Sequence, residues 1–370
     1  MKKIIQAIPF ELKLQLRNLG WQRVSYSSLD HIVHYLNTDF LKPTESDHLI
    51  LPDDDLSAKQ RFYELTTYSP YRHQEFVIEI KEPTVIEPLM GGVIARTNAI
   101  IEECYALPSG QPVPLPYLPL ALYKINQSTI HFERAILLRH PWGDNNYFHF
   151  YNDILSKLGL LSDLNLLFDV PIIVSKKLYN SSYFQSAIAL AGLKHLSWIV
   201  QNKEYIKVDN LISIRSHELT KQGILRNLRL LNIDIASSSE NKRIFLGRLP
   251  PYKRNLSNRE KIIKLCLNLG LEYINCDTLS LEEQINTFAN ASYIVGEQGS
   301  AFSNIIYRYG QPLNVMEILP PEHISTCMFV ISKHLGFNHH FYRSHIGSKQ
   351  HYSVEVNEFE QKLKQFLSEN

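Results

Sequence analysis

The sequence predicts an α/β fold in which sheets of parallel strands carry helices on their faces. From residue 135 onward, short apolar runs rich in β-branched residues alternate with segments of helical periodicity. The stretch 292–317 reads as a strand, a glycine turn, a helix and a second strand, which makes the two strands parallel. Residues 76–105 instead alternate as short strands broken by prolines and glycines, which indicates a small antiparallel region.

Length and composition indicate a soluble globular protein of about two domains. The chain has 370 residues, of which 44% are hydrophobic and 20% are charged, so it can bury a sizeable core. Its 38 basic and 37 acidic residues give a net charge of +1, which excludes nucleic acid or an anionic membrane as the main partner. The cysteines lie far apart, and we expect reduced core residues of a cytoplasmic protein: Cys104, Cys266, Cys276 and Cys327.

The chain also shows no pattern for crossing a membrane. Pro9 interrupts the first apolar run too early for a signal peptide, and no window approaches about 18 uninterrupted apolar residues. We therefore expect a cytoplasmic protein, with a peripheral attachment at the inner face of the membrane left open.

Composition shifts divide the chain into three parts. Residues 1–205 form the first domain, irregular and β-rich over 1–130 and α/β over 131–205, and the small, polar stretch 236–241 is the other candidate boundary. Five prolines within 108–119 predict an extended connector in that domain. Residues 206–350 form a second α/β domain, and 351–370 form a C-terminal helix that we expect to pack across both domains.

An acidic turn in the first domain allows two interpretations. Asp53 and Asp55 follow an apolar run and Pro52, and paired carboxylates at a strand end can hold Mg²⁺ or Mn²⁺ under a nucleotide diphosphate. The same pattern is also typical of a helix start, so both interpretations stay open.

A histidine and an acid lie four residues apart at the start of a predicted helix. A strand at 135–138 leads into this helix, which Asp144 or Asn145 is expected to cap. His149 and Asp153 share a face near its N-terminal end. An acid beside a histidine fixes the imidazole tautomer and raises its proton affinity, which makes a general base. A surface helix pair would have the same spacing.

Basic residues and a glycine turn follow neighbouring strands in the second domain. Two predicted capping boxes, Ser257 with Glu260 and Ser280 with Glu283, begin the intervening helices. Because the carboxyl ends of parallel strands meet at one edge, we expect these groups to form a nucleotide diphosphate site without a metal. The arginines and the N–H groups of the turn would bind phosphate oxygens, and a carboxylate would accept from ribose hydroxyls. A solvated basic loop is the alternative. The expected donor-binding residues are Arg248, Lys253, Arg254, Asn255, Gly296, Glu297, Gln298, Gly299, Ser300, Asn304 and Glu317.

Three blocks, 147–158, 244–274 and 279–320, together resemble the catalytic region of family-61 glycosyltransferases, in the order that the family has them. The family includes plant cell-wall, animal and bacterial capsule or exopolysaccharide enzymes, and the resemblance covers roughly residues 135–320. It implies a GT-B fold, with two Rossmann-like domains facing a cleft, and inverting transfer from a nucleotide sugar without a metal. It places Arg248 and Arg254 at the donor phosphates, and His149 and Asp153 in a motif that faces the cleft.

The chain departs from the family pattern at one position. Where the family usually has histidine followed by Gly-Ala, this chain has Gln298 followed by Gly299 and Ser300. Glutamine can donate a hydrogen bond but cannot titrate. Either that position is not the proton acceptor, or this protein uses a different base, or it is inactive.

The residues and the resemblance predict a bacterial inverting glycosyltransferase. It would move a sugar from a nucleoside diphosphate, with UDP favoured, to a hydroxyl of a surface glycan such as capsule, exopolysaccharide or lipopolysaccharide. The acceptor molecule would be a glycan or a lipid-linked glycan. Residues 1–205 would bind the acceptor and 206–350 the donor, with Asp153 or His149 as the base and no cofactor or metal. The alternatives are a metal-dependent GT-A-like transferase that uses Asp53 and Asp55, and an inactive nucleotide- or glycan-binding protein.

Overall fold

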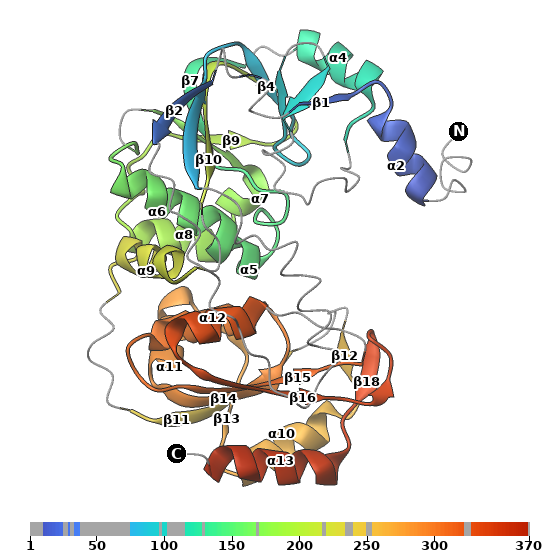
Figure 1. Cartoon of the computed structure of the whole chain (residues 1–370), viewed down its shortest axis with the longest axis vertical. Coiled ribbons are helices and arrows are strands. Elements are labelled where there is room, and N and C mark those ends of the chain that lie inside the picture. Colours follow the sequence, from blue (N-terminus) through green and yellow to red (C-terminus); the bar gives the residue numbers. More distant parts are fainter. Residues whose placement is uncertain are drawn as a thin grey trace. The chain divides into compact units, whose positions relative to one another are not determined.

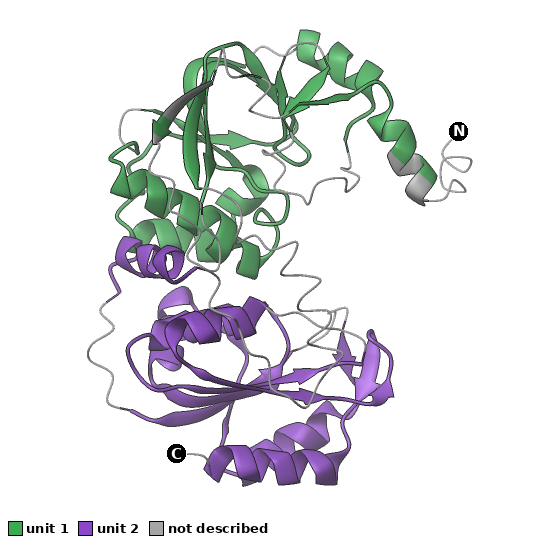
Figure 2. Cartoon of the chain, viewed as in Figure 1, with its two compact units in different colours: residues 1–43, 72–217 green, residues 44–71, 218–370 purple. Residues whose placement is uncertain are grey.

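The computed structural model describes residues 10–24, 29, 33–37, 75–95, 98–101, 115–127, 130–167, 170–216, 220–233, 240–248, 254–321 and 327–368. The chain is a mixed α/β structure with parallel sheets, and it divides into two compact units (Figure 2). Unit 1 comprises residues 1–43 and 72–217, and unit 2 comprises 44–71 and 218–370. Within the described residues, no helix is both long and apolar enough to cross a membrane.

Unit 1 is built on a mixed sheet of 10 strands in the order β1-β6-β5-β4-β10-β7-β8-β9, with β3 also paired to β10 and β2 to β3. Strands β10, β7, β8 and β9 are parallel, whereas β4, β5 and β6 pair antiparallel, as expected for 76–105. The strands are β1 (Gln22–Val24), β2 (Val33–Asn37), β3 (Phe76–Ile80), β4 (Thr84–Ile86), β5 (Val93–Ala95), β6 (Ala99–Ile101), β7 (His131–Leu137), β8 (Ile172–Ser175), β9 (Trp198–Gln201) and β10 (Ile206–Arg215).

The helices of unit 1 that bear on function follow β7. They continue one another without a break: α5 (Tyr147–His149), the π-helix η4 (Phe150–Leu155) and α6 (Ser156–Asp163). Figure 1 shows α5 and α6 with α7 (Lys176–Tyr179) and α8 (Ser182–Leu190) against the parallel part of the sheet. The other described helices of this unit are α2 (Phe10–Asn18) and α4 (Leu118–Asn126).

The structure places the boundary between the units after residue 217 rather than after residue 205. Strand β10 is the reason, because it pairs with β7, β3 and β4 and so lies inside the sheet of unit 1. Its core-facing residues Ile206, Val208 and Leu211 are at most 1% exposed. An apolar strand that starts a new domain and one that completes the previous sheet have the same local pattern.

Unit 2 contains a five-stranded parallel sheet in the order β13-β11-β14-β15-β16. Its strands are β11 (Lys242–Leu246), β13 (Glu272–Ile274), β14 (Ala291–Glu297), β15 (Asn314–Leu319) and β16 (Asn338–Arg343). Counted along the chain, this is the order 2-1-3-4-5 of doubly wound nucleotide-binding folds, whose ligands lie where the order reverses. That point is between the carboxyl ends of β11 and β14.

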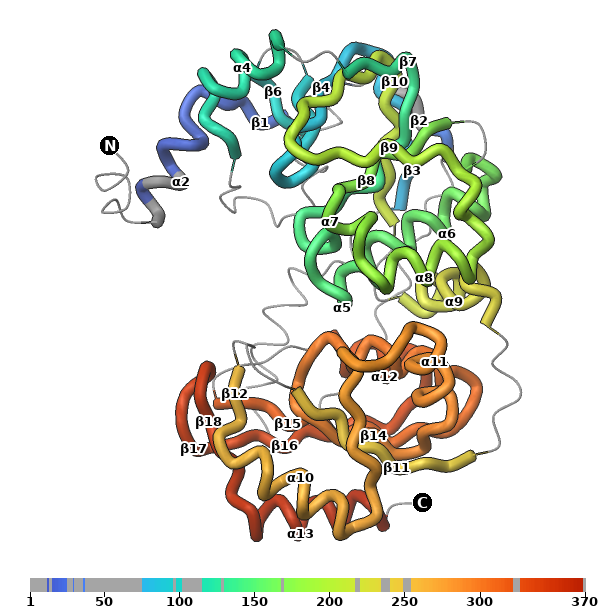
Figure 3. Tube along the Cα trace, turned by 180° about the vertical axis from the view of Figure 1, so that it is seen from behind, coloured from blue at the N-terminus to red at the C-terminus, as the bar shows by residue number. Residues whose placement is uncertain are grey.

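Helices cover both faces of this sheet (Figures 1 and 3). Helices α10 (Arg259–Asn268) and α13 (Val356–Ser368) lie on one face, and α11 (Leu281–Ala289) and α12 (Cys327–Leu335) lie on the other. The buried side chains of α13, Phe359, Leu363 and Phe366, join the core of unit 2. The predicted packing of this helix across both domains stays a prediction. The remaining elements are α9 (Lys221–Leu230), η5 (Cys276–Thr278), η6 (Ser300–Arg308), and a small sheet of β12 (Asn255–Leu256), β17 (Ile346–Gly347) and β18 (His351–Ser353).

One of the two predicted capping boxes is present. The Ser280 hydroxyl accepts from the N–H of Glu283, whose carboxylate accepts from the N–H of Ser280. The prediction for Ser257 is wrong, because α10 starts after Asn258 and the Ser257 hydroxyl donates to the carbonyl of Tyr352 in β18. The described cysteines, Cys266, Cys276 and Cys327, form no disulfide with one another.

Candidate active site

Two basic side chains lie at the point in unit 2 where the strand order reverses. Arg248 follows β11, and its Nη1 donates to the main-chain carbonyl of Gln298 over 2.7 Å. Arg254 precedes β12, and its Nη1 donates to Oε1 of the Gln298 side chain over 3.1 Å. The structure therefore brings together Arg248, Arg254 and the turn after β14, as the sequence predicted. Lys253 lies outside the described residues.

Glycines allow this close approach. A Cβ at Gly299 would lie 3.2 Å from Cδ of Arg248, and one at Gly296 would lie 2.6 Å from Cβ of Leu246 in β11. A larger residue at Gly296 would push the two strands apart, and one at Gly299 would crowd the guanidinium. These glycines thus serve close contact between the strand ends, and neither has a left-handed backbone.

A buried ion pair fixes the other side of the turn. Nε and Nη2 of Arg259, at the start of α10, donate to the two carboxylate oxygens of Glu297 over 2.6 and 2.8 Å. Nη1 of Arg259 also donates to Oδ1 of Asn255 over 3.3 Å. The Glu297 side chain is 1% exposed, so this enclosed acid positions Arg259. The sequence did not predict a role for Arg259. Its position at the start of a helix that directly follows the basic loop could have indicated that it belongs to the same site.

The charges at this site leave it electropositive. Burial lowers the pKa of Arg248, and burial together with the charge of Arg248 lowers the pKa of Arg254. Like charges held together away from water cost free energy, which an anionic ligand would offset. Burial, and then the charge of Glu297, raises the pKa of the Tyr352 hydroxyl, which keeps it protonated and able to donate. Tyr352, in β18, was also missed from the sequence.

Two residues predicted to bind the donor are enclosed in the core of unit 2. Both Glu317 and Asn304 are 0% exposed. The Glu317 carboxylate lies 3.3 Å from Nε2 of His339, whose Nδ1 is 2.8 Å from the Ser332 hydroxyl. Asn304 donates to Oε1 of Gln284 over 2.8 Å. Glu317 is enclosed, but its charge also acts on Arg254 and favours the charged guanidinium, so its carboxylate lies near the arginine site. The predicted role of Glu317 at ribose hydroxyls stays a prediction.

In unit 1 the predicted histidine–acid pair is formed. Nδ1 of His149 lies 2.7 Å from Oδ2 of Asp153, whose side chain is 2% exposed. Because a carboxylate oxygen accepts, the hydrogen is on Nδ1, and Nε2 of His149 keeps its lone pair. The His149 side chain is 26% exposed, so a solvent-accessible imidazole is held by a buried acid.

The backbone under this pair is unusual. Asp153 lies in the π-helix η4, a rare form that occurs frequently at functional sites. The helix also starts later than predicted: Asn146 is its N-cap and accepts from the N–H of Phe148, whereas Asp144 is engaged elsewhere. Period alone could not show a local change from α- to π-helix.

A second histidine, which the sequence analysis left without a role, completes the cluster. Nδ1 of His140 lies 3.5 Å from Oδ2 of Asp153 and accepts from the N–H of Gly143 over 3.1 Å. The neutral ring therefore carries its hydrogen on Nε2. Burial, and then the charges of Lys157 and His149, hold the pKa of His140 well below its usual value. His140 is thus a buried neutral ring stacked on His149, with the ring centroids 5.9 Å apart.

Two hydrogen bonds from buried basic side chains fix the loop that carries His140. Nε of the buried Arg139 donates to Asp144 over 2.7 Å, and Nζ of Lys157 donates to the Arg139 carbonyl over 3.0 Å. Burial raises the pKa of Asp144, and the charge of Arg139 opposes that rise. A Cβ at Gly143 would lie 2.7 Å from Cγ1 of Ile154, so glycine lets the loop pack directly on η4.

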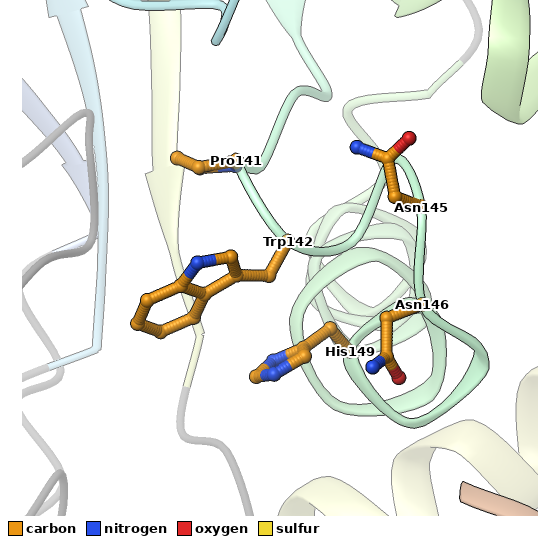
Figure 4. Close-up of a pocket in the computed structure, with 5 residues that line it drawn as sticks. All are labelled: Pro141, Trp142, Asn145, Asn146 and His149. Carbon is orange, nitrogen blue, oxygen red and sulfur yellow. The ribbon is translucent and has the colours of Figure 1, made fainter. Parts of the chain in front are cut away.

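An open pocket of about 370 Å³ lies over the His149 ring (Figure 4). It is lined by Pro141, Trp142, Asn145, Asn146 and His149. In the described part of the chain, one group of three side chains could hold a metal ion: His140, His149 and Asp153, with ligand atoms within 4.8 Å of one another. The Nδ1 atoms of both histidines already take part in hydrogen bonds. A histidine whose Nδ1 is held by an acid is the arrangement of a proton-transfer group. The predicted alternative metal ligands, Asp53 and Asp55, lie outside the described residues.

Comparison with known proteins supports one class of enzyme. Residues 147–317 match the model of the family described as Glycosyltransferase 61, and this segment contains the His149–Asp153 pair and both site arginines. The match supports a glycosyltransferase of family 61, as the resemblance predicted. No curated protein matches the chain.

Among solved structures, the chain is similar to the E. coli heptosyltransferase WaaC with ADP. The two are 11% identical, and the similarity covers 64% of this chain and 100% of that one, with a TM-score of 0.28. A TM-score this low carries no structural conclusion.

Proposed function

We propose that this protein is an inverting, metal-independent glycosyltransferase of the GT-B type. It would transfer a sugar from a nucleoside diphosphate donor to a hydroxyl of a bacterial surface glycan, such as capsule, exopolysaccharide or lipopolysaccharide. The observation that carries the proposal is the meeting of Arg248, Arg254 and the Gln298 turn where the strand order of unit 2 reverses. The family match of residues 147–317 supports the same class.

In this proposal unit 2 binds the donor. Arg248 and Arg254 contact the two phosphates, and the N–H groups at the start of η6 add neutral donors at the same edge. As the bond between the sugar and the diphosphate breaks, negative charge develops on the leaving phosphate, and fixed cations stabilise it without a metal. UDP is the proposed nucleotide.

Unit 1 supplies the base. Nε2 of His149 takes the proton of the acceptor hydroxyl while its oxygen attacks the anomeric carbon from the side opposite the diphosphate. The new C–O bond forms as the bond to the diphosphate breaks, which inverts the configuration and releases the nucleoside diphosphate. Asp153 orients the imidazole and stabilises the imidazolium that forms. Gln298 is 4% exposed and accepts from Arg254, which supports a role in holding the arginine and a base elsewhere.

A series of thermal unfolding measurements tests the proposal. UDP, GDP, CDP and CMP are each added in EDTA and then with Mn²⁺. A ligand at about 100 times its Kd should add about 2.7 kcal/mol to the free energy of unfolding. We expect UDP to raise the midpoint in EDTA.

An arginine at the other end of β11 provides a matched control. Arg243 is exposed and stacks on Tyr293, with its guanidinium 5.1 Å from the ring centroid. Arg254→Ala should abolish the UDP shift and turnover, while Arg243→Ala keeps both. A shift that needs Mn²⁺ would favour a metal-dependent transferase, and binding without turnover of any UDP-sugar would favour an inactive binding protein. The absence of a shift with every nucleotide would contradict the proposed donor site.

A further inference from the structure

The pocket beside His149 contains an aromatic side chain that the donor chemistry does not use. All three tryptophans of the chain are described, and Trp142 is the most open of them at 41% exposed. A single exposed apolar residue needs no explanation. Trp142 differs because it lines a concave pocket together with the proposed base.

The indole is held at a fixed place relative to that base. Its ring centroid lies 5.0 Å from the His149 ring at an interplanar angle of 46°, and 5.9 Å from the His140 ring at 70°. Figure 4 shows the indole beside the His149 imidazole at the mouth of the pocket. The close packing of Gly143 on Ile154 anchors the loop immediately after Trp142. A group that rests on the indole therefore lies next to the base.

Apart from Pro141, the rest of the lining is polar. Asn146 uses its Oδ1 to accept from the N–H of Phe148, so its amide NH₂ is the part that can donate to a ligand. Asn145 is an exposed amide on the same rim. The pocket thus combines one aromatic plate, two amides and an imidazole.

We propose that this pocket binds a pyranose ring of the acceptor, with the Trp142 indole as the stacking surface. The inference rests on the proposed function for its chemistry and names the residues that hold the acceptor in that reaction. A pyranose has one face of C–H groups with partial positive charge, which complements the negative face of an indole. Its hydroxyls can pair with Asn145 and Asn146, and one of them can reach Nε2 of His149.

Other occupants fit the lining less well. A lipid chain would cover the amides of Asn145 and Asn146 without offering them a hydrogen bond, at a cost in binding free energy. A peptide hydroxyl would not need an aromatic plate beside the base. A nucleobase could stack on the indole, so the nucleotide itself is included as an outcome of the test.

The indole N–H resonances of the full chain provide a direct measurement. A ¹H–¹⁵N spectrum should contain three such signals, and Trp142→Phe identifies the one from Trp142. Methyl glycosides of glucose, galactose, mannose, xylose and N-acetylglucosamine are titrated one by one. We expect at least one of them to shift the Trp142 signal and not those of Trp21 and Trp198. If no glycoside moves it, or if UDP moves it instead, the inference is wrong.

Substitutions then separate stacking from general apolar contact. Affinity for the glycosides is measured by calorimetric titration, because these variants lack the Trp142 signal. Trp142→Leu keeps an apolar side chain but loses the π face, so sugar binding should weaken by about tenfold, whereas Trp142→Phe should weaken it less. Trp198→Phe, which alters a tryptophan outside the pocket, is the control and should leave the glycoside response unchanged. Equal affinity of the Leu and Phe variants would overturn the stacking role.

The two proposals fail separately. If glycosides shift Trp142 but no nucleotide stabilises the protein, the saccharide site stands and the transferase does not. If UDP raises the midpoint and a UDP-sugar turns over while no glycoside moves Trp142, the transferase stands and the acceptor is not held by this pocket.

Discussion

The substitution Asp153→Asn tests the proposed base most directly. Asparagine has nearly the same shape as aspartate, and its oxygen can still lie near the 2.7 Å contact with Nδ1 of His149. What the variant loses is the negative charge. It also gains an amide NH₂ that can donate to Nδ1, which would move the ring hydrogen to Nε2 and remove the lone pair that takes the proton.

The size of the effect follows from the geometry. The Asp153 side chain is 2% exposed, so water screens its charge little. Two unit charges about 4 Å apart interact by about 4 kcal/mol at an effective dielectric constant of about 20. Since each 1.36 kcal/mol is about a tenfold change in rate, losing this stabilisation of the imidazolium should lower kcat about 10³-fold. That value lies within the range of about 10²–10⁴ for general base catalysis.

The assay is the release of UDP from the UDP-sugar that stabilises the protein. Asp163→Asn makes the same chemical change at an exposed residue at the end of α6, and it should keep normal turnover. The UDP-induced midpoint shift should be normal in both variants, because unit 2 carries the proposed donor site. An Asp153→Asn enzyme within about threefold of the normal kcat would refute the assignment of His149 and Asp153 as the base.

Three further predictions concern stability and the donor site. Arg259→Met leaves the buried carboxylate of Glu297 unpaired and should destabilise unit 2 by about 3–5 kcal/mol in urea unfolding, with much of the loss recovered when Glu297→Leu is added. His140 keeps its neutral form in the folded state, so the unfolded chain binds an extra proton below about pH 6.5. As the pH is lowered through that range, the free energy of unfolding should fall by up to about 1.4 kcal/mol per pH unit. His140→Asn keeps an acceptor for the N–H of Gly143 and should remove this dependence, as followed by tryptophan fluorescence. Glu317→Gln should change the Kd of UDP by less than about threefold, because Glu317 is enclosed; a loss of tenfold or more would support the ribose role.

The sequence predicted the elements that repeat a strong local pattern. The apolar strand, glycine turn and second strand over 291–319 are confirmed as parallel neighbours, with Gly310 in the left-handed conformation that ends such a helix. The helix between them is a 3₁₀-helix, which the apolar pattern alone did not distinguish from an α-helix. The histidine–acid pair of His149 and Asp153 was also predictable, because four residues along a helix place two side chains on one face.

Errors arose where a residue had two chemically equivalent options. Ser257 and Ser280 have the same spacing to a glutamate, but only Ser280 caps its helix, because β18 offers the Ser257 hydroxyl a carbonyl from far along the chain. Strand β10 joined the sheet of unit 1 for the same kind of reason, since its partners β3, β4 and β7 are distant in sequence.

The sequence by itself determined that this is an α/β protein with basic residues and a glycine turn at the ends of neighbouring parallel strands, because periodicity and turn chemistry are local. Only the tertiary structure decided which side chains face one another. It enclosed Glu317 and Asn304, added Arg259 and Tyr352 to the arginine site, and set His140 and Trp142 beside the His149–Asp153 pair. Whether a polar side chain binds a ligand or another residue depends on which distant strand or helix lies within hydrogen-bond distance, and that is fixed only when the chain packs.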